Sequence, residues 1–75
     1  MLDNQITLYP NPISNEVNIQ TDLDVSETYV FDLQGKQLKN TTSKKVNLSE
    51  LSSGIYLVKV KLKNNEIWTN KVIKN

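Results

Sequence analysis

The residue types that most often carry out catalysis are missing from this 75-residue chain, and its carboxylates are scattered singly apart from Asp22 and Asp24. The chain has no cysteine and no histidine, which excludes thiol chemistry, zinc sites with the usual ligands and acid–base catalysis by histidine. The serines therefore have no histidine partner for nucleophilic catalysis. Asp22 and Asp24 flank Leu23 and could supply oxygen ligands for calcium, although a solvated loop is the simpler interpretation. We expect no enzyme, no cofactor and no metal.

The charge balance argues against a nucleic-acid partner. All nine basic residues are lysines, and eight acidic residues leave a formal net charge of +1, without the concentrated basic patch that nucleic-acid binding requires.

No apolar run approaches the length of about 20 residues that spans a bilayer. Residues 1–4 lack the basic head and apolar run of a signal peptide. A chain of 75 residues has room for one domain only, so we predict a single domain over residues 1–75. Within it, residues 1–5 are a linker or an expression remnant.

Apolar and polar residues alternate along most of the chain, and β-branched residues are frequent. This period of two is typical of strands with one buried face. A single helical turn fits only residues 48–51. The pattern predicts an all-β fold, a small antiparallel β-sandwich of about seven strands, immunoglobulin-like. The expected strands are residues 6–9, 16–20, 28–33, 37–40, 44–48, 55–63 and 66–74.

The longest expected strand shows the alternation most clearly. One face carries the core candidates Tyr56, Val58, Val60 and Leu62, and the other carries Lys59, Lys61 and Lys63. Lysines on a strand discourage edge-to-edge aggregation, so a solvated face explains them. A basic stripe that recruits a partner is the alternative.

Three short segments have the composition of turns. Asp32 followed by Gly35 predicts a type I turn closed by a left-handed glycine. Gly54 comes just before Tyr56 at the start of the longest strand, after a second turn. In the tetrapeptide Tyr9-Pro10-Asn11-Pro12, each proline fixes φ and extends the preceding residue, so this segment is stiff and ends the first strand.

The order of these landmarks resembles a known family. "YPNP" at residues 9–12, "VNI" at 17–19, "DLQGK" at 32–36, "LSSGIYLVKV" at 51–60 and "NKVIKN" at 70–75 are together similar to the type A C-terminal sorting domain of the type IX (Por) secretion system. The resemblance covers essentially the whole chain. One departure is that Asn70 precedes Lys71, where family tails often carry a paired lysine.

The resemblance implies a signal rather than a catalyst. It implies a protein of the Bacteroidetes group in which this domain follows an upstream cargo domain, crosses the periplasm and directs the cargo across the outer membrane to the cell surface or medium. The implied partners are the outer-membrane translocon and a surface sortase, which commonly removes the domain and attaches the cargo to a lipopolysaccharide.

Within this interpretation, the candidate recognition signal is the tail Lys71, Val72, Ile73, Lys74 and Asn75. We expect Val72 and Ile73 to fix the last strand to the sandwich while the two lysines reach an acidic partner surface. The alternative is that the tail merely completes the sheet. We expect a sorting signal to stand at the end of its polypeptide, as Asn75 stands at the end of this chain.

Two other functions fit a small β-sandwich. A carbohydrate-binding or adhesive module would use Trp68 with Tyr29 or Tyr9 as an exposed stacking platform. A passive spacer within a large surface protein would need no site at all.

Overall fold

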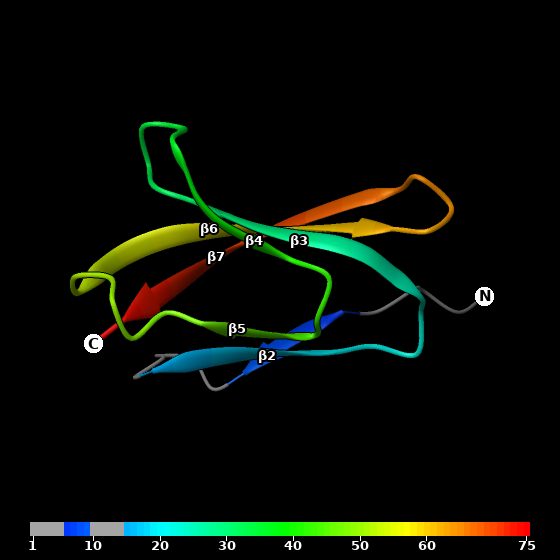
Figure 1. Cartoon of the computed structure of the whole chain (residues 1–75), viewed down its shortest axis with the longest axis horizontal. Coiled ribbons are helices and arrows are strands. Elements are labelled where there is room, and N and C mark those ends of the chain that lie inside the picture. Colours follow the sequence, from blue (N-terminus) through cyan, green and yellow to red (C-terminus); the bar gives the residue numbers. More distant parts are fainter. Residues whose placement is uncertain (1–5, 10–14) are drawn as a thin grey trace.

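The alternating segments of the sequence all form strands. The computed structural model describes residues 6–9 and 15–75, and within them seven strands follow one another without a helix. The third strand begins earlier than expected, at Val25 instead of Thr28, and the other ends lie close to the predicted ones. The strands are β1 (Thr7–Tyr9), β2 (Glu16–Gln20), β3 (Val25–Phe31), β4 (Gln37–Thr41), β5 (Lys45–Asn47), β6 (Gly54–Leu62) and β7 (Ile67–Lys74) (Figure 1).

The described strands form two antiparallel sheets that lie one above the other (Figure 1). The strand order is β1-β2-β5 in one sheet and β4-β3-β6-β7 in the other. Matching β1, β2, β3, β5, β6 and β7 to strands A, B, C, E, F and G gives the A-B-E and C-F-G neighbours of an immunoglobulin-like sandwich, with β4 added beside β3. The expected all-β sandwich is confirmed.

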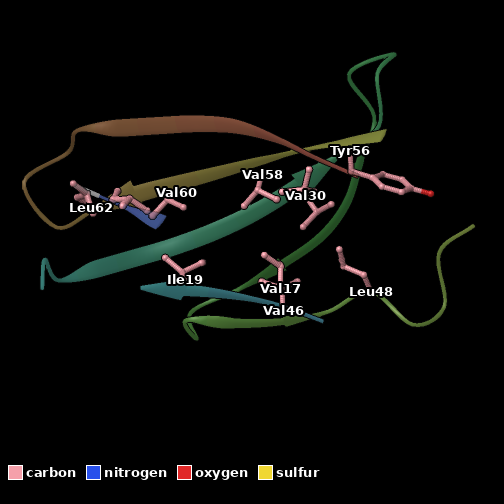
Figure 2. Close-up of a cluster of buried hydrophobic side chains, with 11 residues drawn as sticks. Val17, Ile19, Val30, Val46, Leu48, Tyr56, Val58, Val60 and Leu62 are labelled. Atoms are coloured by element: carbon pink, nitrogen blue, oxygen red, sulfur yellow. The ribbon is translucent and has the colours of Figure 1, made fainter. Parts of the chain in front are cut away.

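The core lies between the sheets and is built from their facing side chains (Figure 2). Val17 and Val46 come from the three-stranded sheet, and Val30 and Val58 come from the other; each is at most 3% exposed. Burying such a side chain stabilises the fold by about 1.5–3 kcal/mol. The predicted core face of β6 is confirmed, because Tyr56, Val58, Val60 and Leu62 are all buried.

The turn between β3 and β4 has the predicted geometry. The Asp32 carbonyl oxygen accepts the Gly35 N–H at 3.1 Å. The Asp32 carboxylate accepts the N–H groups of Gln34 and Lys36, each at 2.9 Å. Gly35 has a φ of +91°, a left-handed conformation that glycine adopts without steric cost. The Asp32 and Gly35 assignment is therefore confirmed.

The turn between β6 and β7 makes the last two strands a hairpin, as expected. The Leu62 carbonyl oxygen accepts the Asn65 N–H at 2.9 Å, and Asn65 has a φ of +73°. Asparagine is one of the few residues that tolerate this conformation. The Lys63 N–H donates to the Asp24 carbonyl oxygen at 3.0 Å, which ties the turn to the β2–β3 loop. The hairpin therefore places the tail at an edge of the four-stranded sheet.

Candidate recognition surface

The tail is held along an edge strand. Residues Lys71 to Lys74 form the last part of β7, which lies at the edge of the four-stranded sheet beside β6. Val72 pairs with Tyr56, and Lys74 pairs with Gly54. The two landmarks Tyr56 and Gly54 therefore position the candidate signal, and the tail has a fixed backbone conformation.

The tail residues alternate between the two faces of the sheet. Val72 is fully buried and Lys74 is only 9% exposed, so both face the core. Lys71 and Ile73 face outward, with Ile73 48% exposed. The expectation that Val72 and Ile73 anchor the strand together is thus right for Val72 and wrong for Ile73. The expectation that the two lysines reach a partner surface stays a prediction. Lys71 is exposed, whereas Lys74 lies on the same face as Val72, because side chains two apart on a strand share a face. Asn75 follows the strand and is exposed.

The burial of Lys74 concerns its aliphatic stem. Thr28 Oγ1 is the one buried side-chain polar atom without a hydrogen-bond partner among residues 6–9 and 15–75. The Lys74 ammonium is therefore not enclosed. Lysine commonly buries its methylene groups along an apolar surface and keeps its charge in water. Lys74 thus covers the end of the core, whereas Lys71 is the exposed lysine of the tail.

Asn70 has a structural role next to Lys71. Its Oδ1 atom accepts the Lys71 backbone N–H at 2.8 Å. An edge strand presents unpaired backbone groups that can template aggregation. The Asn70 side chain satisfies one of these donors.

The strand register places Lys71 in a row of side chains across the four-stranded sheet. Phe31 on β3 pairs with Leu57 on β6, and Leu57 pairs with Lys71 on β7. Lys59 lies two residues from Leu57 and shares its face. We call six of the outward-facing side chains on and beside this row the outer surface: Phe31, Leu57, Lys59, Lys61, Lys71 and Ile73. Tyr29, Glu27 and Ile55 face the same way, because they pair with Lys59, Lys61 and Ile73.

Cationic and aromatic side chains meet on the outer surface. The Lys59 ammonium lies 5.7 Å from the centre of the Phe31 ring, within the range of a cation–π interaction. The Tyr29 and Phe31 ring centres are 6.2 Å apart, with 39° between the ring planes. This distance falls in the range that aromatic pairs prefer. These contacts give the middle of the surface a defined arrangement.

Glu27 borders this surface and is already hydrogen-bonded. Its Oε1 atom accepts the Tyr29 hydroxyl at 2.6 Å, and its Oε2 atom accepts the Asn40 amide at 3.1 Å. The hydrogen bond from Tyr29, then that from Asn40 and the charge of Lys61 hold the pKa of Glu27 below its ordinary value. The same hydrogen bond raises the pKa of Tyr29. Glu27 is therefore ionised at neutral pH and has two of its acceptor positions filled.

Sequence landmarks that lie far apart in the chain meet at one end of the sandwich. The Asp32 turn and the segment around Gly54 and Tyr56 line a shared hollow of about 370 Å³. Lys74 pairs with Gly54 at this same end.

The Tyr9 side chain is 46% exposed on β1, in the other sheet. Pro10, Asn11 and Pro12 lie outside the described residues.

The aromatic residues do not form a carbohydrate platform. Trp68 pairs with the buried Val60 and packs against the core, so it faces inward. Tyr29 pairs with Lys59 and faces outward on the same sheet, and Tyr9 belongs to the other sheet. A stacking platform requires ring faces on one accessible surface, and the fold separates these three.

The acidic residues within residues 6–9 and 15–75 do not assemble into a metal site. In the described part of the chain, no group of three or more acidic side chains could hold a metal ion. Asp22 and Asp24, the calcium candidates, are both exposed. The part of the chain that the structure describes contains no helix long and apolar enough to cross a membrane.

The sequence pointed to the tail as a candidate signal, which stays a prediction, and it did not predict that Phe31 and Lys59 are neighbours of the tail. Both residues were visible as members of alternating strands. What the sequence did not reveal was that β3 and β7 flank β6 on its two sides, which brings Phe31 and Lys71 into one row.

Comparison with known proteins assigns the family. Residues 7–75 match the family model described as "Secretion system C-terminal sorting domain". No curated protein matches the chain. Since the match covers nearly all of the sequence, the chain belongs to this family, whose domains are the C-terminal sorting signals of type IX secretion. The protein that carries this domain is thus destined for the cell surface or the extracellular space. The family is typical of the Bacteroidetes.

Proposed function

We propose that the outer-membrane translocon of the type IX system reads this domain as a folded signal, through the outward side of the tail strand. The observation that supports this proposal is the alternation within β7. Val72 and the stem of Lys74 are buried against the core, while Lys71 and Ile73 face outward. A translocon that accepts different cargoes needs one shared feature, and a side chain fixed on a strand offers it at a defined position.

The domain itself acts as a ligand and not as an enzyme. Its chain has no histidine or cysteine to serve as a base or nucleophile. In our proposal the domain passes through the periplasm at the end of its cargo, engages the translocon, and is then removed by a surface sortase that attaches the cargo to the cell surface. The chemistry of removal belongs to the sortase.

A reporter fusion tests this function. A fluorescent protein with a Sec signal at its N-terminus and these 75 residues at its C-terminus is produced in a host with an active type IX system. We expect the reporter at the cell surface or in the medium. In a host whose translocon has been deleted, the same fusion should remain in the periplasm. Equal surface fractions in the two hosts would contradict the proposal.

The same fusion tests the sortase step separately. If a sortase removes the domain, the surface reporter has the mass of the cargo without the sorting domain, increased by any attached lipopolysaccharide. A surface reporter that keeps the intact domain would show that export occurs without removal, and the translocon proposal would stand alone.

A further inference from the structure

The outer surface extends well beyond the tail and combines cations with apolar groups. Lys59, Lys61 and Lys71 come from the two neighbouring strands β6 and β7. Among them lie Leu57 and the 48% exposed Ile73. Phe31 and Leu57 are half-buried and Ile73 is exposed, so apolar side chains are partly accessible between the lysines, as on an interaction surface.

The positive charges of the outer surface are only partly balanced from within the domain. Glu27 pairs with Lys61 across β3 and β6, and it is the acidic residue in the described strands of this sheet. Its carboxylate already accepts hydrogen bonds from Tyr29 and Asn40. Lys59 and Lys71 therefore remain available to an acidic partner.

The centre of the outer surface is ordered before any partner binds. The Lys59 ammonium lies over the Phe31 ring at 5.7 Å, and the Tyr29 hydroxyl that borders it is fixed by Glu27 at 2.6 Å. All these side chains stand on paired strands. Preorganisation of this kind reduces the entropy lost on binding.

We propose that the outer surface docks an acidic protein surface of the secretion machinery that carries an exposed apolar side chain. The carboxylates of the partner face Lys59 and Lys71, and its apolar group packs against Phe31, Leu57 and Ile73. This inference rests on the proposed function and adds to it the chemistry of the partner and a contact area that reaches from the tail across to β3.

A protein fits this surface better than a membrane does. Electrostatic binding to anionic lipid generally uses clusters of about 4–8 lysines or arginines. The outer surface has three lysines, Lys59, Lys61 and Lys71, separated by large apolar side chains on a rigid sheet. A fixed arrangement of charged and apolar side chains favours a partner with a complementary shape and charge.

The experiment compares charge reversal on the two sheets, using the reporter fusion. The outer variant is Lys59→Glu/Lys61→Gln, and the matched control is Lys45→Glu/Lys44→Gln, at the three-stranded sheet. Each pair changes the net charge by the same amount. We expect the secreted fraction of the outer variant to fall by at least about tenfold, since like charges brought together at an interface weaken binding by that factor or more. We expect the control to match the parent.

Thermal melts of the isolated variants identify any failure to fold. If the outer variant is unfolded, the neutral pair Lys59→Gln/Lys61→Gln decides in its place, with a smaller loss of secretion expected. Secretion of the folded outer variant at the level of the parent would overturn the inference and leave the proposed function standing. An equal loss in the outer variant and the control would also overturn it, because the effect would then be one of overall charge.

Two further outcomes concern the export route and the class of partner. A parent fusion that is not secreted contradicts the proposed function, and the inference fails with it. Sedimentation with vesicles of phosphatidylglycerol and lipopolysaccharide distinguishes a lipid partner. If the parent domain binds these vesicles and the outer variant does not, the partner is a membrane and not a protein. If the parent domain does not bind them, the result supports a protein partner.

Discussion

The Tyr56 hydroxyl donates a hydrogen bond to the Ser52 carbonyl oxygen at 2.6 Å. The Tyr56 ring is buried near the start of β6, and Ser52 lies four residues upstream in the connection from β5. In immunoglobulin-like sandwiches, a tyrosine near the start of strand F makes the same kind of bond to the upstream backbone, the tyrosine corner. This bond fixes the segment before Gly54, and Gly54 in turn pairs with Lys74 of the tail.

Removal of the Tyr56 hydroxyl tests this corner. Tyr56→Phe should lower the free energy of unfolding by about 0.5–1.5 kcal/mol, the usual net contribution of one hydrogen bond. Chemical denaturation of the parent and the variant measures this difference. Tyr9→Phe, at a 46% exposed side chain, is the control and should have a smaller effect. Equal stability of Tyr56→Phe and the parent would show that the bond contributes nothing.

Thr28 offers a substitution that should stabilise the domain. It is fully buried on β3, and its Oγ1 atom has no hydrogen-bond partner. An unsatisfied buried hydroxyl costs about 1–3 kcal/mol, and valine has nearly the same shape and a high strand propensity. Thr28→Val should therefore raise the melting temperature, whereas Thr41→Val at the partly exposed partner position on β4 should change it less. A lower melting temperature for Thr28→Val would indicate that the hydroxyl has a partner in solution.

The contact between Glu27 and Tyr29 should make stability depend on pH. Since the fold lowers the pKa of Glu27, the associated stability is present above the carboxyl's unfolded pKa and is lost as pH falls through its folded value. The fold raises the pKa of Tyr29, so that contribution is present below the phenol's unfolded pKa and is lost as pH rises through the folded value. Carbon-13 NMR titration should show a depressed Glu27 pKa that Tyr29→Phe shifts back upward. A Glu27 pKa that Tyr29→Phe leaves unchanged would contradict the assigned hydrogen bond.

The alternation in the sequence predicted the strands because each strand has one face in the core. Val58 and Val60 identify the inner face of β6 without any knowledge of its neighbours. Gly35 could be assigned because its left-handed turn follows from local chemistry. The start of β3 was missed, since Val25 to Glu27 show no clear alternation, and their strand structure comes from pairing with the end of β6.

The sequence did not predict the surroundings of the tail. The face on which Lys71 and Lys74 lie depends on the register of β7 against β6, and a shift of one residue would exchange the two lysines. The row from Phe31 to Lys71 depends on pairing between strands that are distant in the chain. Long-range pairing of this kind is decided by packing of the whole sandwich, so residue types and local spacing carry little information about it.

If the translocon reads the outward-facing lysine of the tail strand during export, Lys71→Ala should block secretion without unfolding the domain. Lys71 is exposed, so its truncation should change the free energy of unfolding by no more than about 0.5 kcal/mol. Lys74 is unsuitable because the loss of its buried stem would itself destabilise the domain. The measurement is the ratio of surface to periplasmic reporter for the parent, for Lys71→Ala and for the exposed-turn control Lys36→Ala. We expect Lys71→Ala to fold like the parent and to accumulate in the periplasm, while Lys36→Ala is exported normally. Export of a folded Lys71→Ala domain at the level of the parent would show that this lysine is not read.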